Sequence, residues 1–316
     1  EGKTLDHRLA TMITELCVGG LALFKRNISD PAQLTTLCRD VQSLAKRNGS
    51  PPLLIAIDQE GGPVARLGPP FTTFPGNRAI GRSRFPGAAT EFGTITAKEL
   101  KAVGINVNFA PVLDTVPFEA DTFVMVDRVF GDSPRLVMDL GTEVIDSMQL
   151  NGVAATAKHF PGIGRTIIDS HADLPFLETN KETLHATDLL PFRAAVQHNV
   201  AAMMLAHVVY ADIDSEWPAS LSAKVSKTLL RDTMGFSGVS ITDDLDMGAI
   251  AKHYDSQTVA ARLCNAQVDI ALICRDAPEM ETFHRQLMEA AEASDKTREA
   301  HLESVKRILA LKATYA

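Results

Sequence analysis

Seven short runs of apolar residues, each followed by a loop and a helical stretch, constrain the fold of this chain more than any other feature. The runs are rich in valine, isoleucine, leucine and alanine, and they lack the alternating polar residues of a strand with one wet face. Continuous apolar strands separated by helices are typical of a parallel sheet that is covered on both faces. The runs span residues 18–24, 53–57, 105–112, 153–157, 201–205, 238–241 and 270–274.

This rhythm predicts an α/β protein built as a single (β/α)8 barrel of the TIM type. The eighth strand is not identified. A helix over about residues 5–16 precedes the first apolar run, and we therefore expect that the first barrel strand has been trimmed at the N-terminus. Further helices are expected to begin at Pro31, to cover 90–103 before Gly104, and to cover 296–312. No long linker divides the 316 residues, so one catalytic barrel is expected over 1–316.

Composition limits the partners and the compartment. The formal net charge of −8 argues against a nucleic-acid partner, because such proteins need a basic surface. No apolar run is long enough to cross a bilayer, so no membrane partner is expected. We also expect a monomer. The cysteines show no CxxC spacing and favour buried free thiols in a reducing compartment, so a cytoplasmic location is expected and an exported form is left open. They are Cys17, Cys38, Cys264 and Cys274.

Ionisable residues follow five of the apolar runs at the point where each run ends. In a parallel barrel the carboxyl ends of all strands share one face, and enzymes of this architecture place their active sites there. Because one or two such residues could arise by chance but five are unexpected, the sequence predicts a shared site on that face. The residues concerned are Asp58, Asp114, Lys158 with His159, His207, and Asp243 with Asp244.

The Asp243–Asp244 pair is compatible with three roles. It could bind a metal, although more oxygen or histidine ligands would be needed nearby. Asp246 adds a third carboxylate, but the spacing is not that of a calcium loop. One aspartate could cap the following helix, and the other could act as a nucleophile.

A glycine-rich loop after His159 carries Asp169 and His171 two residues apart. The carboxylate of Asp169 can reach back to orient the imidazole, and such a pair is suited to proton transfer near neutral pH. A solvated loop pair without a role is the plain alternative. A metal site formed by His159 and His171 is a weaker one, because no third ligand stands at a recognised spacing.

Three segments resemble glycoside hydrolase family 3. They are IDQEGGPVAR at 57–66, KHFPGIG at 158–164 together with DSH at 169–171, and TDDLDM at 242–247. The single barrel and the DSH loop are similar to the β-N-acetylhexosaminidase branch, the peptidoglycan-recycling β-N-acetylglucosaminidases. Further matches at 19–24, 108–114, 128–131 and 206–208 extend the resemblance over nearly the whole chain.

The resemblance implies a role for each matching residue. Asp243 would be the nucleophile, and His171, paired with Asp169, would be the general acid/base. No metal and no cofactor are implied. The residues that would hold the hydroxyl groups of the sugar and position its ring are Asp58, Arg66, Arg128, Lys158 and His159.

Two residues depart from the family pattern. Ile163 stands where the family usually has a second histidine in the KHFPGHG segment, and Pro63 stands where an arginine is common after the two glycines. Both lie beside the implied site, so they bear on substrate preference or on the position of the loops. Neither replaces a residue that carries the implied chemistry.

The resemblance therefore implies a retaining exo-β-N-acetylglucosaminidase. It would release terminal β-linked N-acetylglucosamine, from peptidoglycan fragments of the GlcNAc-anhydroMurNAc type, through a covalent glycosyl-enzyme. The expected partner is thus a carbohydrate. Three alternatives stay open: a glycoside phosphorylase of the same family, because a neutral histidine repels phosphate less than a carboxylate would; a β-glucosidase, which usually takes its acid from a second domain; and a sugar-binding protein without catalysis.

Overall fold

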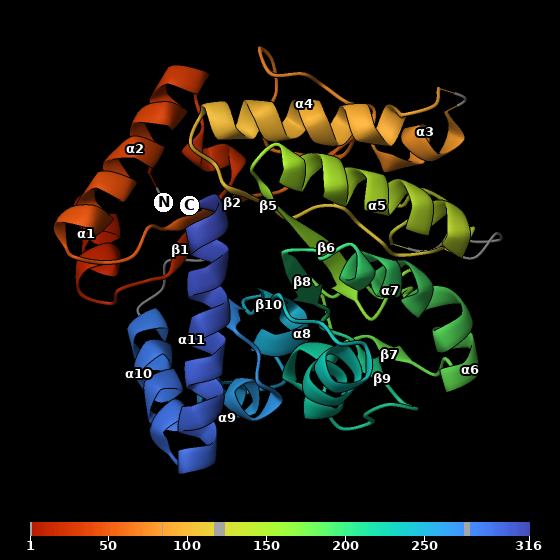
Figure 1. The fold of residues 1–316 in the computed structure, drawn as a ribbon. Helices are drawn as coiled ribbons and strands as arrows, with labels where there is room; N and C mark the ends of the chain where they lie inside the picture. The colour runs from red at the N-terminus through yellow and green to blue at the C-terminus, as the bar shows by residue number, and fades with distance from the viewer. Residues whose placement is uncertain (1, 84, 117–123, 275–278) are drawn as a thin grey trace.

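A parallel, curled sheet of seven strands forms the centre of the molecule, and helices surround it (Figure 1). The computed structural model describes residues 2–83, 85–116, 124–274 and 279–316. The strands follow one another in the order β1-β2-β5-β6-β8-β10-β11, and every neighbouring pair is parallel. They are β1 (Gly20–Leu23), β2 (Leu54–Ile57), β5 (Val107–Asn108), β6 (Ala154–Phe160), β8 (Ala202–Leu205), β10 (Val239–Asp244) and β11 (Ile270–Leu272). Each of the seven predicted apolar runs thus coincides with a strand, although β6 and β10 extend three residues beyond the ends of their runs.

The helices lie mainly between these strands in the sequence. The larger ones are α1 (His7–Thr14), α2 (Pro31–Arg47), α4 (Ala88–Ala102), α5 (Pro134–Leu150), α7 (Leu189–Gln197), α9 (Ser256–Ala266), α10 (Glu279–Glu292) and α11 (Asp295–Tyr315). Shorter helical segments are η1 (Lys25–Asn27), α3 (Asn77–Arg82), α6 (Lys181–Thr183), η2 (Leu184–Asp188), η3 (Ala219–Leu221), η4 (Lys224–Thr233) and α8 (Gly248–Ala251). Two small ribbons, β3 (Gln59–Gly61) with β4 (Val64–Ala65) and β7 (Phe176–Leu177) with β9 (Val209–Tyr210), lie outside the main sheet.

The apolar runs are continuous because both faces of the sheet are buried. In β2, Leu54 and Ala56 belong to a cluster inside the curl of the sheet, whereas Ile55 and Ile57 pack in the larger cluster that includes the surrounding helices. Successive side chains of a strand point to opposite faces, so a strand buried on both sides needs apolar residues at every position.

The C-terminal helix α11 packs against the interior of the curled sheet. Leu311 and Ile308 join the cluster that β1, β2, β5, β6, β8, β10 and β11 line from inside. Asp269, just before β11, accepts hydrogen bonds from Arg307 at 2.8 Å and from Ser304 and Arg231. This buried carboxylate fixes α11 to the amino-terminal end of β11, at the opposite end of the strand from Leu272, which pairs with Asp244 of β10.

The closed eight-stranded barrel predicted from the sequence is not confirmed. In the part of the chain that the structure describes, the main sheet has seven strands, and no strand pairing joins β11 to β1. The carboxyl ends of these two edge strands are nevertheless close, because Arg26 Nη2 donates a hydrogen bond of 2.8 Å to the carbonyl oxygen of Cys274. The confirmed architecture is an α/β fold with a curled parallel half-barrel.

The local signals in the sequence have clear structural counterparts. Asp30 caps α2 by accepting a hydrogen bond from the amide of Gln33, and Pro31 occupies the first turn. Gly104, just past α4, has φ of +86°, a conformation that favours glycine. All four cysteines are free, as expected. Only Cys38 is buried, whereas Cys264 and Cys274 are partly exposed and Cys17 is exposed, so the expectation of buried thiols holds for Cys38 alone. No helix among the described residues combines the length and apolar character needed to cross a membrane.

Candidate active site

Ionisable side chains gather where the strands of the main sheet end. Asp58 directly follows β2, Lys158 and His159 lie within β6, His207 follows β8, and Asp243 lies near the end of β10. Because all these strands are parallel, these residues lie together at the carboxyl-terminal end of the sheet, as the sequence predicted.

Lys158 occupies the centre of a buried network of charges. Its Nζ atom lies 2.8 Å from Asp58 Oδ1 and 2.7 Å from Glu60 Oε1, and its side chain is only 2% exposed. Arg66 Nη2 contacts the other oxygen of Asp58 at 3.0 Å. A buried cation between two carboxylates is stable only because each charge is paired.

Glu60 extends this network to Arg128. The guanidinium of Arg128 binds both carboxylate oxygens of Glu60, at 2.7 Å and 3.0 Å, and the Glu60 side chain is 1% exposed. Sequence reasoning did not select Glu60 as a site residue, although it stands in the same segment as Asp58. The signal in the sequence is that Glu60 is a second acidic residue two positions after Asp58, just before Gly61 and Gly62.

The network keeps its members charged. Burial by itself would raise the pKa of Asp58, but Lys158 and Arg66 outweigh it and lower that pKa to about 2. Burial also opposes the ionised form of Glu60, whose pKa is nevertheless lowered by Lys158 and Arg128. Conversely, Asp58 and Glu60 raise the pKa of Lys158 against the effect of burial.

His159 is held by Asp114, which the sequence placed on the same strand-end face without assigning it a role. His159 Nδ1 lies 2.8 Å from Asp114 Oδ2, and both side chains are buried. Because a carboxylate only accepts, Nδ1 carries the hydrogen, and Nε2 lies 3.5 Å from Arg128 Nη2. Ile163, which stands where the family usually has a second histidine, contacts the site through its backbone. Its amide donates a hydrogen bond of 2.7 Å to Asp114 Oδ1.

Asp243 is partly exposed at the end of β10. Its Oδ1 atom accepts a hydrogen bond of 2.8 Å from the amide of Asp244. Burial alone would raise the pKa of Asp243, but His159 and His207, together with that amide, outweigh it, and the pKa is lowered. The side chain is therefore an accessible carboxylate that stays ionised near neutral pH.

Asp169 and His171 form a hydrogen-bonded pair on an exposed loop. His171 Nδ1 lies 2.8 Å from Asp169 Oδ1, and the same oxygen accepts the amide of His171 at 2.9 Å. Burial by itself would raise the pKa of Asp169, but the two hydrogen bonds from His171 together outweigh it and lower that pKa. Nδ1 carries the hydrogen, which leaves Nε2 of His171 open for proton transfer.

The loop that carries this pair is docked on α8, which follows β10. The amide of Gly248 donates to the carbonyl oxygen of His171 at 3.1 Å, and the amide of Ala249 donates to that of Ser170 at 3.0 Å. A Cβ atom at Gly248 would come within 2.5 Å of the Ala172 carbonyl oxygen, so glycine permits this approach. No hydrogen bond or ion pair within the described ranges joins Asp169 or His171 to Asp243.

The sequence-predicted residues thus fall into two groups. One group is a buried network on the strand ends, next to Asp243, and it also contains Glu60 and Asp114. The other is the exposed Asp169–His171 pair. Its loop is hydrogen-bonded to Gly248 and Ala249 of α8, the helix that follows β10 and Asp243. The network comprises Asp58, Arg66, Arg128, Lys158 and His159.

The sequence of this chain is similar to one protein family and to several known hexosaminidases. Residues 3–311 match the glycosyl hydrolase family 3 N-terminal domain. The chain is 40% identical, over 84% of its length, to a beta-hexosaminidase from Thiobacillus denitrificans and covers 77% of that protein. It is 35% identical, over 98% of its length, to beta-hexosaminidase A from Pseudoalteromonas piscicida and spans 55% of that protein.

Solved structures show the same likeness. A family 3 beta-N-acetylglucosaminidase from Paenibacillus sp. FPU-7 superposes with a TM-score of 0.94 at 39% identity; all of this chain and 60% of that one are covered. A beta-N-acetylhexosaminidase from Beutenbergia cavernae superposes with a TM-score of 0.91 at 27% identity, covering 98% of this chain and 94% of the other.

Proposed function

Because this chain belongs to glycosyl hydrolase family 3, we propose that it is a retaining exo-β-N-acetylglucosaminidase. It removes terminal β-linked N-acetylglucosamine through a covalent glycosyl-enzyme. The observation that carries this proposal is an ionised, partly exposed Asp243 beside a buried network of cations, with a histidine–aspartate pair docked on the following helix. The names of the similar hexosaminidases support the choice of sugar.

Asp243 is suited to attack the anomeric carbon. A nucleophilic carboxylate must be ionised and must reach the substrate, and Asp243 meets both conditions. Its amide contact to Asp244 occupies Oδ1 and leaves Oδ2 for the attack. In a double displacement the carboxylate enters from the face opposite the leaving group, and water then displaces it, so the product keeps the β-configuration.

His171 supplies and recovers the proton. Its Nε2 protonates the leaving oxygen in the first step and takes a proton from water in the second. Asp169 holds the imidazole through Nδ1 and stabilises the imidazolium, as the aspartate of a serine protease does for its histidine. This pair replaces the second carboxylate of most retaining glycosidases.

The charge network binds the sugar. Asp58 is an ionised acceptor for hydroxyl groups, and Arg66 and Lys158 are donors within the same cluster. Glu60 is buried with both oxygens paired, so it holds Lys158 and Arg128 in place. Pairing holds these groups in place before substrate binds, which lowers the cost of orienting the ring.

Peptidoglycan fragments are the proposed natural substrates, and this choice rests on the resemblance of the DSH loop to the recycling branch. Phosphorolysis is the second candidate. A histidine acid/base is neutral when it has given up its proton, so it repels incoming phosphate less than a carboxylate would. An assay on an aryl β-N-acetylglucosaminide, with and without phosphate, separates the two reactions. Proton NMR of the first sugar product tests retention: β-N-acetylglucosamine supports the proposal, and an α-anomer formed first contradicts it.

A further inference from the structure

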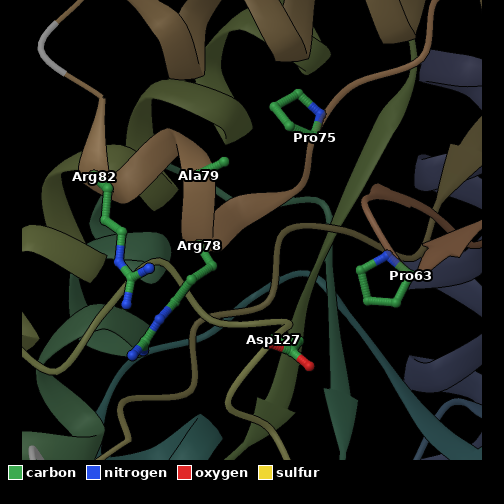
Figure 2. Close-up of a pocket in the computed structure, with 6 residues that line it drawn as sticks. All are labelled: Pro63, Pro75, Arg78, Ala79, Arg82 and Asp127. Carbon is green, nitrogen blue, oxygen red and sulfur yellow. The ribbon is translucent and has the colours of Figure 1, made fainter.

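A cavity of about 510 Å³ lies beside the network of Glu60 and Arg128. Figure 2 shows its walls, which come from three separate segments. Pro63 belongs to the turn between β3 and β4, Asp127 precedes Arg128, and the remaining residues come from α3 and the residue pair before it. The complete lining is Pro63, Pro75, Arg78, Ala79, Arg82 and Asp127, and we call this cavity the arginine groove.

The groove is fixed to the segments that carry the charge network. Asn77, the first residue of α3, donates from Nδ2 to the carbonyl oxygen of Arg128 at 2.9 Å. Gly81 of α3 packs directly on the backbone of Phe130, two residues after Arg128. A Cβ atom added at Gly81 would lie 1.8 Å from the Phe130 carbonyl oxygen. These two contacts to the backbone of the Arg128 segment fix the position of α3, so the backbone positions of its two arginines are defined next to the charge network.

Arg78 and Arg82 bring two unpaired cations to this groove. They stand four positions apart on α3, and Figure 2 shows both guanidinium groups on the same side of the helix. Among the described residues neither has a hydrogen bond or an ion pair, whereas Arg66 and Arg128 are both paired with carboxylates. Pro63, Pro75 and Ala79 offer no charge to compensate them, and Asp127 is exposed.

We propose that the arginine groove binds a carboxylate on the leaving-group side of the substrate, a proposal that rests on the proposed function. Each guanidinium presents a fork of N–H donors that can bind a carboxylate through two parallel hydrogen bonds, and two such groups on one side of α3 add their charges at the same place. A neutral sugar would leave both cations unused. Asp127 repels an anion from its part of the groove, which places the carboxylate next to α3.

The test compares two substrates that differ only in charge. Both are N-acetylglucosaminyl-β-1,4-N-acetylmuramic acid disaccharides; one carries the free lactyl carboxylate and the other its methylamide. We expect the intact chain to favour the acid over the amide by about tenfold in kcat/KM, as two charge-assisted hydrogen bonds allow. The double variant Arg78→Gln/Arg82→Gln should bring this ratio close to one. Asp127→Asn should raise it, and high salt should lower it in the intact chain.

Two further variants make the result specific. Arg285→Gln/Arg298→Gln removes the same number of charges from exposed positions on α10 and α11 and should keep the ratio of the intact chain. Arg78→Lys/Arg82→Lys keeps the charge without the fork and should give an intermediate ratio. A ratio near one in the intact chain, or a ratio that survives Arg78→Gln/Arg82→Gln, overturns the groove proposal and leaves the glycosidase standing. Absence of turnover on both substrates refutes the proposed function and the groove proposal with it.

Discussion

His207 Nε2 lies 3.0 Å from the carbonyl oxygen of Asp244, so the end of β8 holds the backbone next to Asp243. A carbonyl only accepts, so Nε2 carries the hydrogen, and Nδ1 accepts the hydroxyl of Ser220 at 2.7 Å. Burial lowers the pKa of His207. His207 is therefore a positioning residue for the proposed nucleophile.

His207→Ala should lower kcat by about 10- to 100-fold with a smaller change in KM, because a displaced nucleophile loses alignment with the anomeric carbon. Ser220→Ala keeps the imidazole and removes one hydrogen bond, so it should cost about 1 kcal/mol of stability and little activity. Steady-state kinetics and urea unfolding measure both effects. Full kcat in folded His207→Ala protein would show that the contact to Asp244 has no bearing on catalysis.

Lys158→Met should destabilise the protein by about 3–5 kcal/mol at neutral pH, because Asp58 and Glu60 lose their shared buried cation. The folded-state pKa of Asp58, about 2, lies below its unfolded value. Its ionisation thus stabilises the intact protein above about pH 4, and this contribution disappears as the pH falls through about 2. The stability gap between variant and intact protein should therefore shrink on acidification. Urea unfolding from neutral pH down to about pH 2 measures it, because the contribution of Asp58 is lost between about pH 4 and pH 2. A gap independent of pH over that range would argue against the charge network.

Asp269→Asn provides a matched control at the opposite end of the sheet. Asp269 is also a buried carboxylate paired with two arginines, Arg231 and Arg307. Its replacement should destabilise the fold by about 3 kcal/mol or more. Because Asp269 stands at the start of β11, kcat of the folded variant should be that of the intact protein. A large loss of kcat at unchanged folding would mean that α11 influences the active site.

His171→Ala should lower the rate on a natural disaccharide by about 10²–10⁴-fold, the usual contribution of a general acid. An aryl glycoside with a dinitrophenyl leaving group scarcely needs protonation, so its glycosylation step should fall much less. Asp169→Asn should give an intermediate loss, because the imidazole remains but its orientation and charge support are weakened. Pre-steady-state kinetics on both substrates measure these differences. Equal losses on the two leaving groups would indicate a structural role for His171.

The sequence predicted the strands well because their burial leaves a local signal. Ile55 and Ile57 on one face and Leu54 and Ala56 on the other make β2 apolar throughout. The run at 105–112 contains only the short β5 (Val107–Asn108), because asparagine side chains there take over backbone pairing. Asn106 Oδ1, for example, accepts the amide of Ile55 at 2.8 Å. Closure of the sheet depends on packing between residues far apart in the chain and has no comparable local signal.

The candidate site was predictable only in part for the same reason. The strand-end positions of Asp58, Lys158 and Asp243 follow from the apolar runs that precede them. The pairing of Lys158 with Glu60 joins segments far apart in the sequence, and no spacing rule reveals it. The partnership of His159 with Asp114 is equally long-range. Asp169 and His171 were predictable as a pair because they are neighbours in the chain.

Covalent trapping of Asp243 tests the central claim most directly. A 2-acetamido-2-deoxy-5-fluoro glycosyl donor should form a stable glycosyl-enzyme, and mass spectrometry of the digested protein should place the sugar on Asp243. Asp243→Asn should take up no label while it remains folded, because the amide is a far weaker nucleophile. A label on Asp244 or Asp246, or an equal label on Asp243→Asn, would contradict the account.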